Sequence, residues 1–202
     1  MQSRCLPISL SKTMSIDSVL NKLFGKQEEK INSKTPTTTI GFIGLTGSGK
    51  STLINTLLGE QLAPVSYCST TQQTTSFLYQ SKIALYDTKG LEDGTEYLNN
   101  EKLIWLQSLN ERILVINYSL REVISMVNLL NTLSLTFCVI VNKCDRLPIV
   151  NLPKFRDGIE SEIKELTKKS VPLFFLSKYE MLDHFKDDWI QFKTFLNARR
   201  NA

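Results

Sequence analysis

One eight-residue stretch restricts the fold of this chain more than any other feature. Residues 44–51 read Gly-Leu-Thr-Gly-Ser-Gly-Lys-Ser and fit the phosphate-binding loop pattern G-x-x-x-x-G-K-[ST] at every fixed position. The preceding residues, Thr38–Ile43, have the composition of a buried strand. The following residues, Ser51–Leu58, place apolar side chains on one helical face and lead into Gly59, a typical helix C-cap. The stretch therefore predicts a strand, a phosphate-binding loop and a helix, in that order.

The residue types of this loop suit the binding of phosphate. Glycines let backbone N–H groups turn toward phosphate oxygens, and the N-terminus of the next helix adds partial positive charge. Lys50 can reach the β- and γ-phosphates, and the Ser51 hydroxyl can ligate Mg²⁺. The predicted ligand-binding residues are Gly44, Thr46, Gly47, Ser48, Gly49, Lys50, Ser51 and Thr52. A chance glycine-rich turn is the alternative, and the complete pattern in its strand–loop–helix context disfavours it.

Composition excludes several other classes of protein. With 202 residues, 42% of them hydrophobic, the chain can form one domain with a substantial core. The net charge of +4 is mild and is not concentrated in one block, so DNA is not indicated as a partner, and RNA, the ribosome and a membrane surface are permitted but unsupported. The four cysteines lack zinc-site spacing. No apolar run reaches the length of about 18 residues that a membrane span needs, and the start lacks a secretory signal, so we expect a cytoplasmic protein.

Residues 1–37 differ in character from the rest and form an N-terminal extension. Apolar residues recur at helical spacing from about residue 15 to residue 25, which predicts a short amphipathic helix, and a polar linker follows it up to residue 37. Packing of this helix on the domain or on a partner is favoured over a membrane-surface location, because its polar face has few lysines; disorder is the third alternative. At the other end, residues 199–202 form a short basic tail.

From residue 38 to residue 198, strand-like and helical patterns alternate. Candidate strands are Thr38–Ile43, Thr75–Gln80, Lys82–Tyr86, Arg112–Asn117, Thr136–Val141 and Leu173–Leu176, and candidate helices are Ser51–Leu58, Glu96–Leu109, Leu120–Leu133, Phe155–Lys168 and Met181–Ala198. The second and third strands are nearly contiguous and should form a hairpin, whereas every other strand leads into a helix, which implies parallel crossovers. The predicted fold class is α/β, a three-layer α/β/α domain with a mostly parallel six-stranded sheet and one antiparallel edge strand.

A second motif follows the third candidate strand, where residues 87–90 read Asp-Thr-Lys-Gly. Asp87, at the carboxyl end of a strand beside the phosphate loop, can hold Mg²⁺, usually through water. Gly90 can offer its backbone N–H to the γ-phosphate of a nucleotide. The D-x-x-G pattern alone is a weak signal, because turns from Asp to Gly are common.

Residues 142–145 read Asn-Lys-Cys-Asp and form a third motif, which can select the base of a nucleotide. Guanine presents a ring N–H and an amino group side by side, and the Asp145 carboxylate can accept both hydrogen bonds, whereas adenine would leave this charge unpaired. The Lys143 stem can lie over the base plane, and Asn142 can tie this loop to the phosphate loop. After the last strand, the backbone of Ser177 and Lys178 could meet the guanine carbonyl oxygen.

In order and spacing, these motifs resemble those of the Ras-like, translation-factor class of P-loop GTPases across residues 38–198. Within that class the chain is most similar to the branch of Era, TrmE and the septins, because Ser69-Thr70-Thr71 resembles the paired threonines of its first switch loop. The resemblance implies a Ras-like G domain that binds GTP or GDP with Mg²⁺ and hydrolyses GTP. It also implies Lys50, Thr71 and Gly90 as catalytic residues, and Ser51, Thr71 and Asp87 as metal ligands. Thr70 could replace Thr71 in this role, and a merely solvated threonine-rich loop is the alternative.

Three positions depart from the family pattern. Leu91 stands where Ras-like enzymes have a water-orienting glutamine, Gly47 where some Era-like enzymes have a potassium-recruiting asparagine, and Lys89 where D-T-P-G has proline. We therefore expect slow intrinsic hydrolysis, below roughly one turnover per minute. Acceleration would then come from a protein partner or a second subunit, acting through residues 63–75 and 88–101 as switch segments. The alternative is a dimerisation or docking module that nucleotide stabilises; an ATP-dependent enzyme is disfavoured by residues 142–145.

Overall fold

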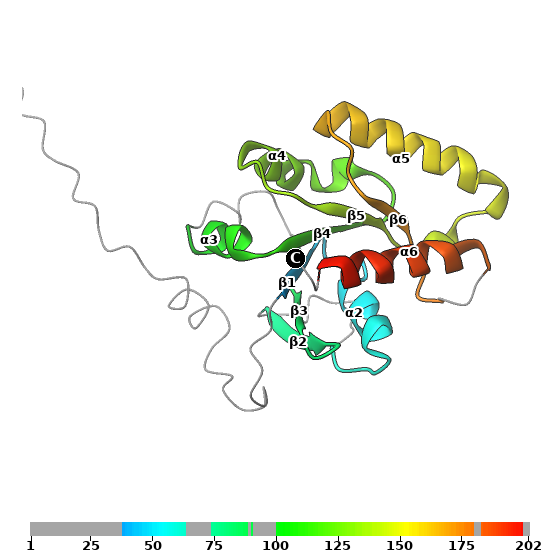
Figure 1. Ribbon diagram of the computed structural model, residues 1–202. Helices are drawn as coiled ribbons and strands as arrows, with labels where there is room; N and C mark the ends of the chain where they lie inside the picture. Colours follow the sequence, from blue (N-terminus) through cyan, green and yellow to red (C-terminus); the bar gives the residue numbers. More distant parts are fainter. Residues whose placement is uncertain (1–37, 64–73, 89, 91–99, 180–182, 200–202) are drawn as a thin grey trace, which may run out of the picture.

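A computed structural model describes residues 38–63, 74–88, 90, 100–179 and 183–199 (Figure 1). The N-terminal extension, with its predicted helix and linker, lies outside the described residues. The same holds for Thr70 and Thr71 of the first predicted switch segment, and for Lys89 and Leu91 of the second.

One mixed sheet of six strands forms the centre of the domain, in the order β2-β3-β1-β4-β5-β6. The strands are β1 (Thr38–Ile43), β2 (Thr75–Tyr79), β3 (Ile83–Asp87), β4 (Glu111–Ile116), β5 (Cys138–Val141) and β6 (Leu173–Phe175). β2 is antiparallel to β3, and all other neighbouring strands are parallel. The predicted hairpin and the predicted parallel crossovers are both confirmed.

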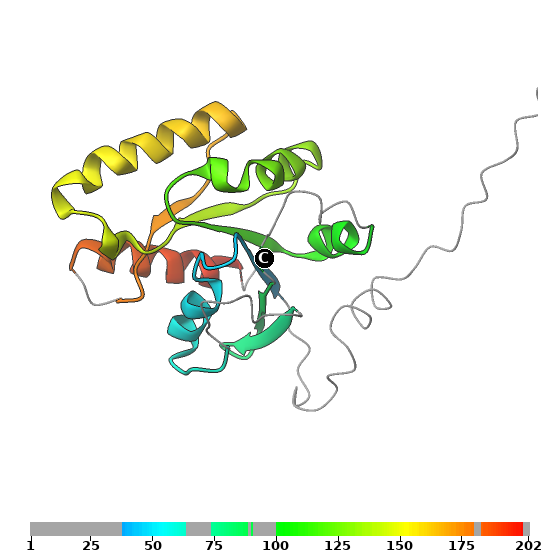
Figure 2. The same cartoon turned by 180° about the vertical axis from the view of Figure 1, so that it is seen from behind.

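Helices cover both faces of this sheet. They are α2 (Lys50–Leu58), α3 (Asn100–Ser108), α4 (Ile124–Thr132), α5 (Leu152–Thr167) and α6 (Asp183–Arg199). In Figures 1 and 2, α2 and α6 lie on one face, and α3, α4 and α5 lie on the other. The three-layer prediction is confirmed. One expected helix, Leu120–Leu133, is divided: it begins as a 3-10 turn, Leu120–Val123, which Ser119 and Glu122 cap, and continues as α4.

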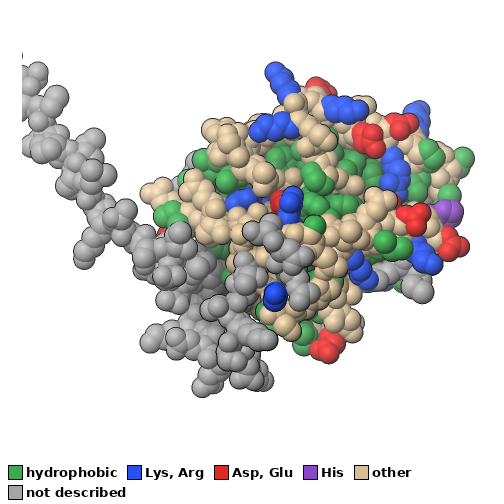
Figure 3. Space-filling view, viewed as in Figure 1, with side chains coloured by type: hydrophobic (Ala, Val, Ile, Leu, Met, Phe, Trp, Pro, Cys, Tyr) green, Lys and Arg blue, Asp and Glu red, His purple; other side chains and the backbone are tan. Residues whose placement is uncertain are grey.

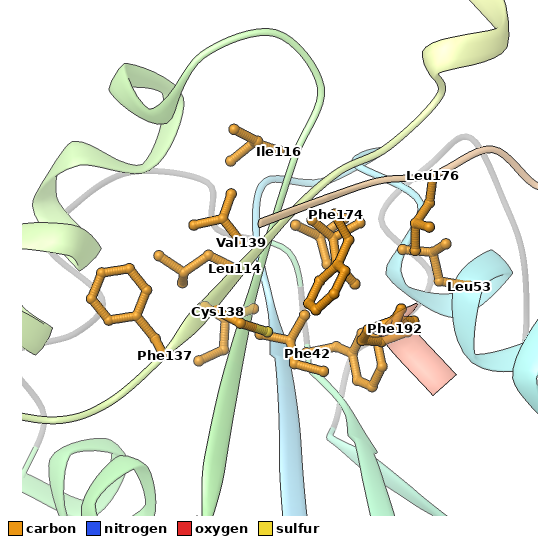
Figure 4. Packing of buried hydrophobic residues seen from close by; sticks show 14 of the residues in the cluster. Phe42, Leu53, Leu114, Ile116, Phe137, Cys138, Val139, Phe174, Leu176 and Phe192 are labelled. Atoms are coloured by element: carbon orange, nitrogen blue, oxygen red, sulfur yellow. The ribbon is translucent and has the colours of Figure 1, made fainter. Parts of the chain in front are cut away.

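The core lies between the sheet and its two helical layers. All residues of β4 and β5 are buried, as expected for central parallel strands covered on both faces. On the face of α2 and α6, Phe42, Leu53 and Phe192 belong to the packed cluster of Figure 4. On the opposite face, a Cβ at Gly41 of β1 would lie 3.2 Å from the Trp105 ring of α3 and 2.5 Å from Cδ1 of Leu109, the residue after that helix.

The last helix is anchored across the sheet at its C-terminal end. Arg199, which the sequence assigns to a basic tail, is the final residue of α6, and its Nε donates to the buried Glu111 carboxylate at 2.8 Å. The Thr38 hydroxyl at the start of β1 donates to the Arg199 carbonyl at 3.0 Å. These contacts place both ends of the described domain at the edge of the sheet opposite the carboxyl ends of the parallel strands.

Basic and acidic side chains are mixed on the face shown in Figure 3, where the described residues form no single basic patch. Among the described helices, none combines the length and the apolar character needed to cross a bilayer.

Candidate functional site

The phosphate loop connects β1 to α2 at the carboxyl edge of the sheet, as predicted. Two of its glycines are required by the geometry. A Cβ at Gly44 would lie 2.2 Å from the Val115 carbonyl oxygen of β4. Gly49 has a φ of +96°, and a Cβ there would lie 2.2 Å from Asn142 Nδ2. The loop is therefore pressed against the two neighbouring segments of the sheet edge, and its path depends on the absence of these side chains.

Lys50 lies inside the curve of the phosphate loop. Only 6% of this residue is exposed, and its Nζ donates to the carbonyl oxygens of Gly44 at 3.0 Å and Leu45 at 3.1 Å. Burial lowers the pKa of Lys50 to about 8, and the negative charge of Asp87 opposes this shift. The loop thus holds a buried cationic donor that only backbone carbonyls satisfy, and an anion can take over these contacts.

Ser51 and Asp87 form a polar pair beside Lys50. The Ser51 hydroxyl donates to Asp87 Oδ2 at 2.6 Å, and the second carboxylate oxygen of the fully buried Asp87 has no hydrogen-bond partner among the described residues. Burial raises the pKa of Asp87, while the Ser51 hydrogen bond and the Lys50 charge lower it. A buried carboxylate with an unsatisfied oxygen, next to a hydroxyl, fits a hard cation that prefers oxygen ligands. These two residues could therefore hold Mg²⁺.

The turn after β3 packs directly against the phosphate loop. The Thr88 hydroxyl donates to the Phe42 carbonyl at 2.6 Å, which anchors the turn to β1. Gly90 is buried, and a Cβ there would lie 2.2–2.5 Å from the side chain and backbone of Thr46. Gly90 therefore lies next to the loop, where its backbone could reach a terminal phosphate. The anchoring role of Thr88 was missed from sequence, because its acceptor is a backbone carbonyl on another strand, which leaves no sequence pattern.

The segment after β5 is joined to the phosphate loop by two side chains. Asn142 Nδ2 donates to the Ser48 carbonyl at 2.8 Å, so the contact anticipated for Asn142 is present. The Lys143 ammonium donates to the Gly47 carbonyl, and burial lowers the pKa of Lys143. Lys143 itself has a φ of +60°, which turns the chain sharply after the strand. The two loops therefore form one continuous surface.

Asp145 and the segment after β6 complete this surface. Asp145 is exposed and makes no hydrogen bond or ion pair with any residue that the structure describes, so both carboxylate oxygens are available to a ligand. The Cys144 N–H donates to the Leu176 carbonyl at 3.2 Å, which brings Ser177 next to residues 142–145. Ser177 is fully buried and Lys178 is exposed.

The predicted site residues that the structure describes thus lie together at one edge of the sheet. Thr52 follows Ser51 in α2, and its carbonyl accepts a local hydrogen bond from the Thr56 hydroxyl, which assigns it no role in the site. Thr71 lies outside the described residues. Sequence motifs did not indicate Trp189 of α6, a buried residue whose indole Nε1 donates to the Ser177 carbonyl at 2.9 Å. A tryptophan in the apolar stripe of the helix could have indicated such a contact, since a buried indole N–H usually has a hydrogen-bond acceptor.

Comparison with known families agrees with this geometry. A family model described as 50S ribosome-binding GTPase matches residues 39–143, which is slightly more than half of the chain. The chain belongs to this GTPase family. The matched residues contain the phosphate loop, the turn after β3 and the first two residues of the base-binding motif, so membership rests on the same residues that form the site.

Solved structures of GTP-binding proteins share the fold of this GTPase. A variant of Era from Aquifex aeolicus, bound to GDP·AlF4⁻, superposes with a TM-score of 0.57 at 21% identity, over 81% of this chain and 57% of that one. Toc33 from Arabidopsis thaliana, in complex with GDP and Mg²⁺, gives 0.53 at 18% identity, over 83% and 80%. NFeoB from S. thermophilus, bound to GDP·AlF4⁻ and K⁺, gives 0.54 at 18%, over 76% and 60%. The fold is therefore that of a Ras-like G domain, as predicted. No curated protein sequence matches the chain.

Proposed function

We propose that this GTPase acts as a slow molecular switch, which binds GTP with Mg²⁺ and hydrolyses it to GDP and phosphate. The observation that carries the proposal is the junction of the two loops, in which Asn142 holds the Ser48 carbonyl at 2.8 Å and Lys143 holds that of Gly47. One loop suits phosphates and the other suits a base, so a single ligand that contacts both is a nucleotide. The free carboxylate of Asp145 makes guanine the favoured base.

Each site residue then has a chemical task. Lys50 and the backbone N–H groups of the phosphate loop bind the β- and γ-phosphates, and Gly90 offers a further N–H to the γ-phosphate. Ser51 and Asp87 would hold Mg²⁺, together with Thr71 from the first switch segment. When bound, this ion neutralises charge on the phosphate oxygens. The chain's own contribution to hydrolysis is therefore positioning and electrostatic stabilisation.

The expected rate is low because two groups that assist hydrolysis in related enzymes are missing at their usual positions. Leu91 offers no hydrogen-bonding group to orient water, and Gly47 has no side chain that could recruit potassium. A group from a protein partner or from a second copy of the chain would then complete the site through residues 63–75 and 88–101. The cytoplasmic location stays a prediction from the sequence.

The deciding experiment is the rate of GTP hydrolysis with Mg²⁺, measured over a wide range of protein concentration. We expect a specific rate below roughly one turnover per minute at low concentration. A specific rate that rises with concentration supports completion of the site by a second subunit, and a flat, slow rate supports activation by another protein. Tight GTP binding without hydrolysis at any concentration would contradict the switch and support the dimerisation or docking module. ATP serves as the control substrate, and faster turnover of ATP would contradict guanine selection.

The lowered pKa of Lys50 predicts that nucleotide binding weakens in alkaline solution. Its ammonium is charged below pH 8 and loses its proton above it, because the pKa of the free protein is about 8. Bound phosphates favour the charged form, so binding raises this pKa and takes up a proton when the pH exceeds 8. We expect affinity for GDP to fall by at most about tenfold per pH unit above pH 8. Calorimetric titration with GDP, in buffers of different ionisation enthalpy, measures the number of protons taken up on binding. We expect more uptake at pH 8.5 than at pH 7, and equal uptake at both pH values would contradict the prediction.

A further inference from the structure

The hydrogen bond between Trp189 and Ser177 links α6 to the segment that follows β6. Trp189 is 2% exposed and Ser177 is fully buried, so water does not compete for the 2.9 Å contact between Nε1 and the carbonyl oxygen. Such a bond constrains the orientation of the whole peptide group between Ser177 and Lys178, because the peptide group is planar.

The orientation of this peptide group decides where the Lys178 N–H points. No cis peptide bond occurs among the described residues, so the Ser177 carbonyl and the Lys178 N–H point in opposite directions. With the carbonyl held by the indole of α6, the N–H is directed away from that indole. Lys178 itself is exposed, and the neighbouring Leu176 carbonyl accepts from Cys144 of the base-binding motif at 3.2 Å.

Hydrogen bonds of the neighbouring residues secure the surroundings of this peptide group. The Leu176 N–H donates to the Val141 carbonyl at 2.8 Å, and the Tyr179 N–H donates to Ser177 Oγ at 3.1 Å. Helix α6 is docked independently, since Asp188 accepts the Phe175 N–H at 3.0 Å and pairs with Arg156. Loss of the indole N–H would therefore remove the hydrogen bond to the Ser177 carbonyl while α6 stays in place.

We infer that Trp189 is a positioning residue of the guanine site: its indole N–H holds the Ser177 carbonyl and thereby aims the Lys178 backbone N–H at the guanine carbonyl oxygen. The inference rests on the proposed function, because it presumes a guanine nucleotide beside residues 142–145. It adds a specificity determinant on a helix that the sequence motifs do not include.

The test compares two nucleotides in the full-length Trp189→Phe variant. Phenylalanine keeps an aromatic ring in the core but removes the donor together with part of the indole, so a control with the same loss of volume is needed. GDP should bind roughly threefold to tenfold more weakly, which corresponds to one net hydrogen bond. The diphosphate of 2-aminopurine riboside lacks the carbonyl oxygen and, with it, the ring N–H that would donate to Asp145. It should bind more weakly than GDP, but equally to the variant and to the natural protein. Trp105→Phe, the same change in the other tryptophan, is the matched control and should alter neither affinity.

If Trp189→Phe weakens the binding of both nucleotides equally, Trp189 has a general structural role and the inference is overturned. An unchanged affinity for GDP would also overturn it. A natural protein that binds neither nucleotide would overturn the proposed function as well, so the two failures are distinguishable. If the variant does not fold, the natural protein provides a second measurement. The NMR signal of the Trp189 indole N–H should shift when the 2-aminopurine nucleotide replaces GDP, while that of Trp105 stays in place. An unmoved Trp189 signal would overturn the inference.

Discussion

Replacement of Lys50 with alanine is expected to weaken GDP and GTP binding by roughly a hundredfold to a thousandfold. The Lys50 ammonium is the buried cation of the phosphate loop, and it is already held at 3.0 and 3.1 Å from two loop carbonyls, so little ordering is needed before it meets phosphate. Removal of one partner of a buried, charge-assisted contact costs about 2–5 kcal/mol in binding free energy, or roughly thirtyfold to several-thousandfold, and the expected loss lies within this range. Equilibrium titration with a fluorescent GDP analogue measures the loss directly.

The fold should survive this change, because burial of the Lys50 charge has a cost that alanine removes together with the two hydrogen bonds. Urea denaturation without nucleotide should therefore give similar free energies of unfolding for the variant and the natural protein. Lys154→Ala, a change of the same kind at an exposed position of α5, is the matched control and should leave both binding and stability unaltered. A loss of less than threefold for Lys50→Ala would refute the assignment of the phosphate loop.

Replacement of Asp145 with asparagine should change the preferred base from guanine to xanthine. The carboxylate can accept two hydrogen bonds from guanine, whereas asparagine can accept only one and offers an N–H₂ group in place of the second oxygen. Xanthine has a carbonyl where guanine has its amino group, so the asparagine donor meets an acceptor. We expect GDP affinity to fall by roughly a hundredfold and affinity for xanthosine diphosphate to exceed it.

Competition between the two diphosphates for a fluorescent nucleotide measures this exchange. Because Asp145 is exposed and has no hydrogen bond or ion pair within the described residues, the substitution should not alter the free energy of unfolding. Asp157→Asn, at an exposed position of α5, is the control and should keep the preference for GDP. GDP affinity that is unchanged in Asp145→Asn would remove this carboxylate from the base site.

The sequence determined the order of elements and the position of the site, because both depend on local patterns. β1 begins and ends at the predicted residues, Thr38 and Ile43, since a polar segment precedes the strand and the phosphate loop follows it. The phosphate loop was visible because its chemistry needs fixed residue types at fixed spacing. The convergence of residues 87–90 and 142–145 on that loop followed from parallel strands, whose carboxyl ends share one edge.

Only the tertiary structure decided how the elements end and how the site is supported. The third strand was predicted to end at Tyr86, but Asp87 also belongs to β3, because it pairs with Phe42 of β1 and Thr75 of β2. β4 begins one residue early, at Glu111, whose buried carboxylate pairs with Arg199. A backbone pairing or an ion pair across 88 positions leaves no local pattern, because the partners meet only in the folded chain.

The same physical difference separates the ligand-binding residues from their supports. Lys50, Asp145 and Ser51 were assigned from sequence because a phosphate, a guanine and a metal ion each restrict the chemistry of the residue beside them. Thr88 and Trp189 support the site through backbone carbonyls, and any residue provides a carbonyl. Motifs therefore reported which groups meet the ligand, whereas the packing of α6 and β1 against the loops determined which side chains keep those groups in position.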